Sequence, residues 1–134
     1  MSEKKLNMRG YVFSRPFLGE RLPQNVQNLV IRDYCIKNNY NFLLSATEYA
    51  MDNCSLMLNK TLNDLVSIDG IVMYSMFQMP EDDKEREGII KEVINKKKIL
   101  AFALENILIN SIKEFDKVDE IWRIKKLTFY KSYK

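Results

Sequence analysis

Short, unbroken apolar segments alternate with helical patterns along this chain, and that alternation restricts the fold more than any other feature. The apolar segments occupy residues 10–14, 41–45, 71–77 and 99–104. A strand buried on both faces is apolar throughout, as in parallel sheets covered by helices, whereas a half-exposed strand alternates apolar and polar residues. The four segments are therefore expected to be strands of a mostly parallel sheet.

The segments between these strands carry apolar residues at helical spacing. Helices are expected from Pro23 to the pair Asn38 and Asn39, from about Asn53 or Ser55 to residue 66, from 81 to 98, and from 112 to 122. In the third helix, acidic residues come first and lysines last, which matches the helix dipole. A basic aromatic tail is expected to follow the last helix over residues 125–134.

This succession of strands and helices predicts an α/β fold. We expect a three-layer sandwich, in which helices cover both faces of a mostly parallel sheet of four or five strands connected by right-handed crossovers. A chain of 134 residues with 46% hydrophobic content suffices for one packed core. Residues 1–134 are therefore expected to form a single domain, with frayed ends at 1–8 and 128–134.

Composition removes several classes of chemistry. The chain contains no histidine, which is the commonest general base and a frequent metal ligand. It contains only four glycines and no glycine-rich phosphate loop, so Rossmann and P-loop nucleotide binding are disfavoured. We therefore expect neither a metal site nor a cofactor.

Charge and cysteine usage bear on location and partners. A net charge of +3 is well short of the basic footprint of a nucleic-acid-binding protein. The two cysteines fall in helical patterns and need no disulfide, and no segment has the apolar length of a signal peptide or a membrane span. The expectation is a cytoplasmic protein with no nucleic-acid partner and no membrane insertion.

Polar residues gather where the expected strands end. In open α/β sheets, ligands bind outside the carboxyl ends of the strands. Loops are polar in any fold of this kind, so the clustering alone gives structural and functional interpretations about equal weight. The residues that follow the four strands, and that would meet at one rim, are Ser14, Arg15, Arg21 and Gln24; Ser45, Thr47, Glu48 and Tyr49; Tyr74, Ser75 and Gln78; and Glu105 and Asn106.

The residue types at this rim suggest anion binding and, as a minority hypothesis, catalysis. Arg15 and Arg21 could together hold a phosphate or carboxylate through bidentate hydrogen bonds. Ser14 is a candidate nucleophile, with Glu48 and Glu105 as candidate general acid and base. In the structural alternative, the two glutamates simply pair with the arginines. The remaining residues are candidate substrate-binding groups, and the tyrosines are equally suited to edge packing.

Three strings in the chain resemble one family. They are RGYVFSRPFLGERLPQNVQNL at residues 9–29, LSATEYAM at 44–51 and YSMFQMPED at 74–82. On these strings the chain resembles the sporadic carbohydrate cluster protein family, over roughly residues 9–126. That resemblance implies a place in bacterial clusters for surface-polysaccharide or unusual-sugar biosynthesis, without an established reaction.

A more distant resemblance concerns architecture. The order of elements and the opening Tyr-x-x-Ser pattern resemble the catalytic domain of serine recombinases of the resolvase type, which implies sheet order 2-1-3-4. Val12 stands where that family has an arginine, and the third strand leads into Ser75, Gln78 and Glu81 instead of arginines. We expect no appended DNA-binding domain. Strand exchange is therefore not expected.

Three functions remain open at this point. The first is an enzyme or binding protein for a phosphorylated or nucleotide-linked sugar. The second is a noncatalytic partner subunit or regulator of a sugar-biosynthetic enzyme, or a homo-oligomer, that docks through the basic aromatic segment 122–133. Nucleic-acid binding ranks last.

Overall fold

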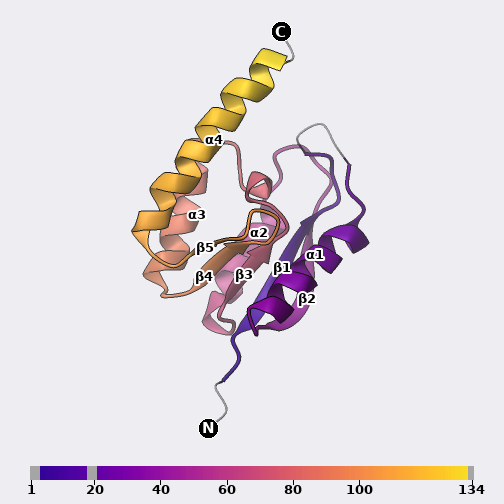
Figure 1. Ribbon diagram of the computed structural model, residues 1–134, viewed down its shortest axis with the longest axis vertical. Helices are drawn as coiled ribbons and strands as arrows, with labels where there is room; N and C mark the ends of the chain where they lie inside the picture. Colours follow the sequence, from indigo (N-terminus) through magenta and orange to yellow (C-terminus); the bar gives the residue numbers. More distant parts are fainter. Residues whose placement is uncertain (1–3, 18–20, 133–134) are drawn as a thin grey trace.

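The chain folds into a five-stranded sheet with helices on both faces (Figure 1). The computed structural model describes residues 4–17 and 21–132, with side chains described as far as residue 127. The strands are β1 (Asn7–Phe13), β2 (Asn41–Glu48), β3 (Gly70–Met73), β4 (Ile99–Phe102) and β5 (Ile107–Ile109). The α-helices are α1 (Gln24–Lys37), α2 (Leu56–Asn63), α3 (Asp83–Asn95) and α4 (Ile112–Ser132), with short 3₁₀ turns η1 (Asp64–Val66) and η2 (Met76–Gln78).

The strand order is β2-β1-β3-β4-β5, which confirms the expected α/β class and the expected 2-1-3-4 order. Strands β1 to β4 are parallel, and β5 adds one antiparallel strand through a tight hairpin with β4. In the central register Tyr11 pairs with Met73, which pairs with Phe102. The carboxyl ends of the parallel strands therefore lie at the same end of the molecule, as the site prediction requires.

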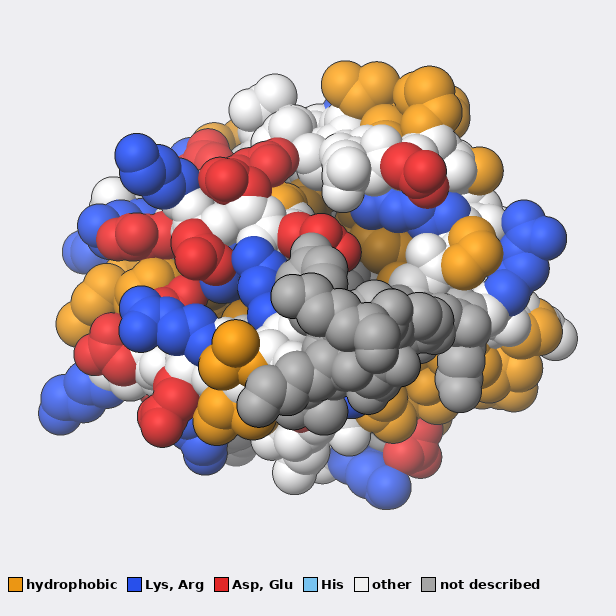
Figure 2. Space-filling model, turned by 90° about the horizontal axis from the view of Figure 1, so that it is seen from above, with side chains coloured by type: hydrophobic (Ala, Val, Ile, Leu, Met, Phe, Trp, Pro, Cys, Tyr) orange, Lys and Arg blue, Asp and Glu red, His pale blue; other side chains and the backbone are white. Residues whose placement is uncertain are grey.

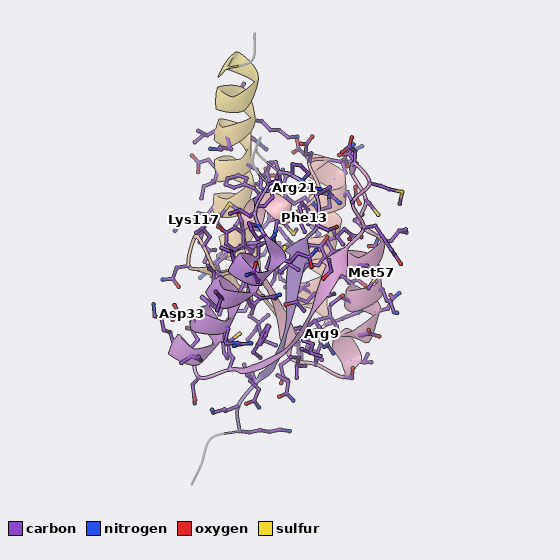
Figure 3. The ribbon with its side chains drawn as sticks, turned by 90° about the vertical axis from the view of Figure 1, so that its right-hand side faces the viewer. Arg9, Phe13, Arg21, Asp33, Met57 and Lys117 are labelled. Carbon is purple, nitrogen blue, oxygen red and sulfur yellow. The ribbon has the colours of Figure 1, made fainter. Side chains whose placement is uncertain are left out.

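Alternate residues of the central strands feed two cores. Tyr11, Phe13 and Met73 pack under α2, α3 and α4, whereas Val12 and Val72 pack under α1. Both groups are fully or almost fully buried. Figure 3 shows the two outer layers, with Asp33 of α1 and Met57 of α2 on opposite sides of the sheet. Burial on both faces explains why these strands are apolar throughout.

Several expected boundaries were wrong at the strand ends. The third strand was expected to reach residue 77 but ends at Met73, because Ser75 caps η2: its hydroxyl accepts from the Phe77 N–H. The second strand was expected to end at residue 45 but continues to Glu48. The fourth was expected to reach 104 but ends at Phe102, and the chain turns there into β5, a fifth strand whose position was not predicted.

β1 and α4 extend further toward the ends of the chain than expected, and residues 1–3 and 133–134 of the expected frayed ends lie outside the described residues. β1 begins at Asn7, and Met8 is fully buried, so these two residues belong to the strand rather than to a frayed end. α4 continues to Ser132, beyond the expected limit at 122 and into the expected tail. Its second half extends past the carboxyl ends of the strands (Figure 1).

Candidate functional site

A cleft of about 570 Å³ opens at the carboxyl ends of β1 and β3, and we call it the rim cleft. It is lined by Phe13 at the end of β1 and residues 15–17 after it, residues 52–55 before α2, residues 77–82 between β3 and α3, Glu85 in the first turn of α3, and Trp122, Lys125 and Lys126 of α4. Figure 2 views the molecule from this end, and acidic and basic side chains both gather on the face it shows. The site therefore draws on four separate parts of the chain.

Aromatic rings form one part of the lining. Phe13 and Phe17 meet edge to face with centroids 5.6 Å apart, and Phe77 and Trp122 do the same at 5.1 Å. The indole N–H of Trp122 donates to the Met76 carbonyl oxygen at 3.1 Å, and the side chain is buried. Trp122 therefore belongs to the packed wall of the cleft, within the segment that was expected to dock on a partner.

Arg15 lines the rim cleft and also forms hydrogen bonds that stabilise one of its loops. Its Nη1 donates to the carbonyl oxygens of Tyr49, Met51 and Cys54, the last at 2.9 Å. The guanidinium carbon lies 4.0 Å from the centroid of the Phe13 ring. These contacts hold the loop between β2 and α2 against the end of β1.

Glu48 is the most heavily hydrogen-bonded carboxylate at the rim. It accepts from the Tyr11 hydroxyl at 2.8 Å, from the Met57 N–H at 3.0 Å and from the Leu58 N–H at 3.1 Å. Burial alone would raise the pKa of the Glu48 carboxyl, but these hydrogen bonds outweigh burial and hold its pKa below the ordinary value. Burial, followed by the bond to Glu48, raises the pKa of the Tyr11 hydroxyl. The structure thus gives Glu48 a clear role as an ionised cap on α2.

Ser14 faces a different hollow from its neighbour Arg15. Its hydroxyl donates to the main-chain oxygen of Glu48 at 2.7 Å. With Arg21, Leu22, Pro23 and Gln24 it lines a shallower space of about 290 Å³, which we call the Ser14 hollow. Arg21 lies at the same end of the molecule as Phe13 (Figure 3). Ser14, Arg21 and Gln24 are brought together as expected, whereas Arg15 and Arg21 line separate hollows.

A buried polar network joins the ends of β1, β3 and β4. The Ser75 hydroxyl donates to Glu105 at 2.7 Å, and the Met76 N–H donates to the other oxygen of the same carboxylate at 2.9 Å. Gln78 donates to Gln27 at 2.7 Å, and Gln27 donates in turn to the Phe13 carbonyl oxygen at 2.9 Å. Ser75 and Glu105 therefore meet as predicted, and they hold the rim in shape.

Gln27 was not predicted as part of the site, although it is fully buried and ties α1 to β1. The available signal was its place on the inward stripe of α1 with Ile31 and Tyr34. A polar residue on such a stripe needs an internal hydrogen-bond partner.

None of the remaining predicted residues lines the rim cleft, and Ser45 and Thr47, which were expected to follow the second strand, lie inside β2 because that strand continues to Glu48. Ser45 donates to Asn28 of α1 at 2.5 Å, Thr47 lies within β2, and Tyr49 is half exposed. Tyr74 is buried against Phe17, and Asn106 adopts the left-handed conformation in the turn before β5. Of the predicted residues, only Arg15 and Gln78 line the rim cleft. The catalytic roles of Ser14, Glu48 and Glu105 stay predictions.

Within the described ranges, no group of three or more acidic or cysteine side chains is placed to hold a metal ion. Among the same residues, no helix has the length and apolar character needed to cross a bilayer.

Comparison with known proteins bears on the fold. No family model matches the chain, and no curated protein matches it. The crystal structure of the N-terminal catalytic domain of TP901-1 integrase is similar, with a TM-score of 0.61 at 14% identity, and the match covers 90% of this chain and 95% of that one. This similarity confirms the resolvase-like architecture. Nothing in the comparisons supports the carbohydrate cluster family.

Proposed function

We propose that this protein binds a phosphorylated or nucleotide-linked sugar in the rim cleft. The observation that carries the proposal is the lining of that cleft, which combines aromatic rings, carboxylates and ammonium groups around one space of about 570 Å³. Small-molecule sites are typically concave, with apolar and aromatic walls and a few well-placed polar groups. The pathway, surface-carbohydrate synthesis, is supported by the sequence resemblance alone.

Each kind of side chain in the lining suits one part of such a ligand. Phe77 is half-buried and offers an apolar surface for the C–H face of a sugar ring. Asp52 and Asn53 offer acceptors for ring hydroxyls. Lys125 lies with its ammonium 5.8 Å from the centroid of the Phe77 ring, where it can pair with a phosphate while the sugar packs beside it.

Binding without turnover fits the rim chemistry better than catalysis. The Ser14 hydroxyl donates to a main-chain oxygen, which cannot act as a base. Glu48 and Glu105 use their oxygens to accept hydrogen bonds from neighbouring main-chain and side-chain donors. A nucleophilic serine needs an adjacent base or a lowered pKa, and these contacts supply neither.

The proposal predicts that a phosphorylated sugar raises the melting temperature of the protein, because a ligand that binds only the native state stabilises it. The panel should contain glucose 6-phosphate, glucosamine 6-phosphate, UDP-glucose, free glucose and inorganic phosphate. For the best ligand, Lys125→Ala should weaken binding by about two- to fivefold, as expected for loss of one exposed charged contact.

Lys117→Ala is the matched control, because Lys117 is exposed on the same helix and does not line the rim cleft. Its dissociation constant should equal that of the unmodified protein. If no sugar phosphate or nucleotide sugar changes the melting temperature at concentrations well above physiological levels, the proposed function is wrong.

A further inference from the structure

The charges of the rim cleft are unbalanced toward the negative. Among the described residues, four carboxylates and three cationic groups line it, namely Asp52, Glu81, Asp82 and Glu85 against Arg15, Lys125 and Lys126. A ligand that carried only negative charge would meet an excess of carboxylates, and like charges brought together disfavour binding. The charges of the lining therefore favour a ligand that carries a positively charged group.

Two of the three cations are held by main-chain oxygens and do not neutralise the acids beside them. Arg15 donates through Nη1 to three carbonyl groups. The Lys126 ammonium donates to the main-chain oxygen of Glu81 at 2.6 Å and lies 3.5 Å from Asp83, outside the cleft lining. In the part of the chain that the structure describes, neither cation forms an ion pair with Asp52 or with the Glu81 carboxylate.

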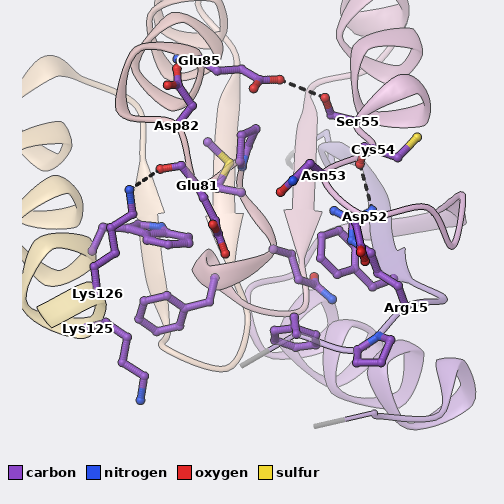
Figure 4. A pocket seen from close by; sticks show the side chains of 18 residues that line it. Arg15, Asp52, Asn53, Cys54, Ser55, Glu81, Asp82, Glu85, Lys125 and Lys126 are labelled. Atoms are coloured by element: carbon purple, nitrogen blue, oxygen red, sulfur yellow. Dashed lines mark hydrogen bonds between the residues drawn. The ribbon is translucent and has the colours of Figure 1, made fainter. Parts of the chain in front are cut away.

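Two of the four carboxylates accept hydrogen bonds from residues that the structure describes, and the other two do not. The Asp82 carboxylate caps α3 by accepting from the Glu85 N–H at 2.9 Å, and Glu85 accepts from the Ser55 hydroxyl at 2.9 Å. Among the described residues, the carboxylates of Asp52 and Glu81 have no hydrogen-bond or ion-pair partner. Figure 4 shows them on facing sides of the cleft, one before α2 and the other before α3.

We propose that the ligand of the rim cleft is the monophosphate of an amino sugar, with its protonated amine between Asp52 and Glu81 and its phosphate toward Lys125. This inference rests on the proposed function and narrows its substrate class. An ammonium group donates charge-assisted hydrogen bonds to carboxylates, which are stronger than those of a neutral hydroxyl. A diphosphate-linked nucleotide would place more negative charge among the same acids and is the weaker fit.

The test compares three ligands that differ only at one carbon: glucosamine 6-phosphate, N-acetylglucosamine 6-phosphate and glucose 6-phosphate. Dissociation constants are measured by calorimetric titration at neutral pH. The amine should bind about tenfold or more tightly than either analogue, the difference expected for one charge-assisted hydrogen bond. In Asp52→Asn and Glu81→Gln this preference should fall, and in the double variant the three constants should become nearly equal.

Glu87→Gln is the matched control, because Glu87 lies on α3, pairs with Lys91 at 2.8 Å and does not line the rim cleft. It should keep the full preference for the amine. Equal binding of all three phosphates would overturn this inference and leave the proposed function standing, as would a preference that survives in the double variant. Failure of every phosphorylated sugar to bind would overturn both.

Discussion

The Glu48 carboxylate, at the end of β2, stabilises the fold by hydrogen bonding to two neighbouring elements. It accepts hydrogen bonds from the N–H groups of Met57 and Leu58 in the first turn of α2, where the helix dipole favours a negative charge. It also accepts a hydrogen bond from the hydroxyl of Tyr11 on the neighbouring strand. One side chain therefore joins β1, β2 and α2.

This role predicts a specific pH dependence. The folded-state pKa of Glu48 lies below its unfolded value, so ionisation of Glu48 stabilises the protein above the ordinary glutamate pKa of about 4.3, and that stability is lost as pH falls through the folded-state pKa. Glu48→Gln should lower the free energy of unfolding at pH 7 by about 2–3 kcal/mol. The difference between the two proteins should shrink in urea denaturation below pH 4.

Glu87→Gln again provides the comparison, since its ion pair with Lys91 is exposed and contributes little. A constant difference between Glu48→Gln and the unmodified protein from pH 7 to pH 3 would show that the charge of Glu48 does not stabilise the fold.

Two glycines lie in opposite packing environments, one in a crowded strand and the other on an open helix surface. Gly70 begins β3, and a Cβ atom there would collide with the main-chain oxygen of Ile99 in β4. Gly88 lies in the middle of α3, and a Cβ atom there would meet nothing within 4 Å. The same substitution should therefore have opposite effects at the two sites.

Gly70→Ala should destabilise the protein by about 2 kcal/mol or more, because backbone atoms cannot move aside without disturbing the sheet. Gly88→Ala should stabilise it by about 0.5–1 kcal/mol, because alanine restricts the unfolded chain and suits a helix interior. Thermal and urea unfolding of both variants measure the two effects. A destabilised Gly88→Ala, or an unaffected Gly70→Ala, would contradict this account of the strand and helix packing.

The elements themselves could largely be predicted, because burial on both faces leaves an apolar signature in β1, β3 and β4. The residues at which these strands end could not be predicted. β3 stops at Met73 because Ser75 and Gln78 form a capping box, and Glu105 fixes Met76 from 29 residues away. Hydrogen bonds between residues so far apart in the sequence leave no local pattern, and they decide where these strands end.

At the scale of the whole molecule, the position of the site could be predicted but most of its lining could not. Parallel strands bring their carboxyl ends to one edge, and among the predicted residues Arg15 and Gln78 line the rim cleft there. Asp52, Glu81 and Lys125 were missed because each lies in a loop or on a helix surface, where a charged residue is ordinarily solvated. Only the docking of α4 beside the loops before α2 and α3 turns them into one lining.

The docking of α4 depends on Arg86, a fully buried cation on α3. Its guanidinium donates to Asp119 of α4 at 3.0 Å and to the carbonyl oxygens of Pro80 and Glu81 at 3.0 and 3.1 Å. The guanidinium carbon lies 4.6 Å from the centroid of the Trp122 ring. Arg86 therefore secures the wall of the rim cleft that carries Trp122, Lys125 and Lys126, although it does not line the cleft itself.

Arg86→Met should detach this wall before the rest of the protein unfolds. Breaking a buried ion pair typically costs about 3–5 kcal/mol, and the lower end of that range is expected here because Asp119 keeps its ion pair with Arg123. Trp122 is the only tryptophan, so its fluorescence reports on α4 directly, and we expect its emission to shift to longer wavelength in native buffer. Arg123→Met is the control, because Arg123 pairs with the same Asp119 from an exposed position and should cost no more than about 0.5 kcal/mol. Unchanged Trp122 emission and unchanged amide exchange along α4 in Arg86→Met would mean that apolar contacts of Val118 and Trp122 hold the helix on their own.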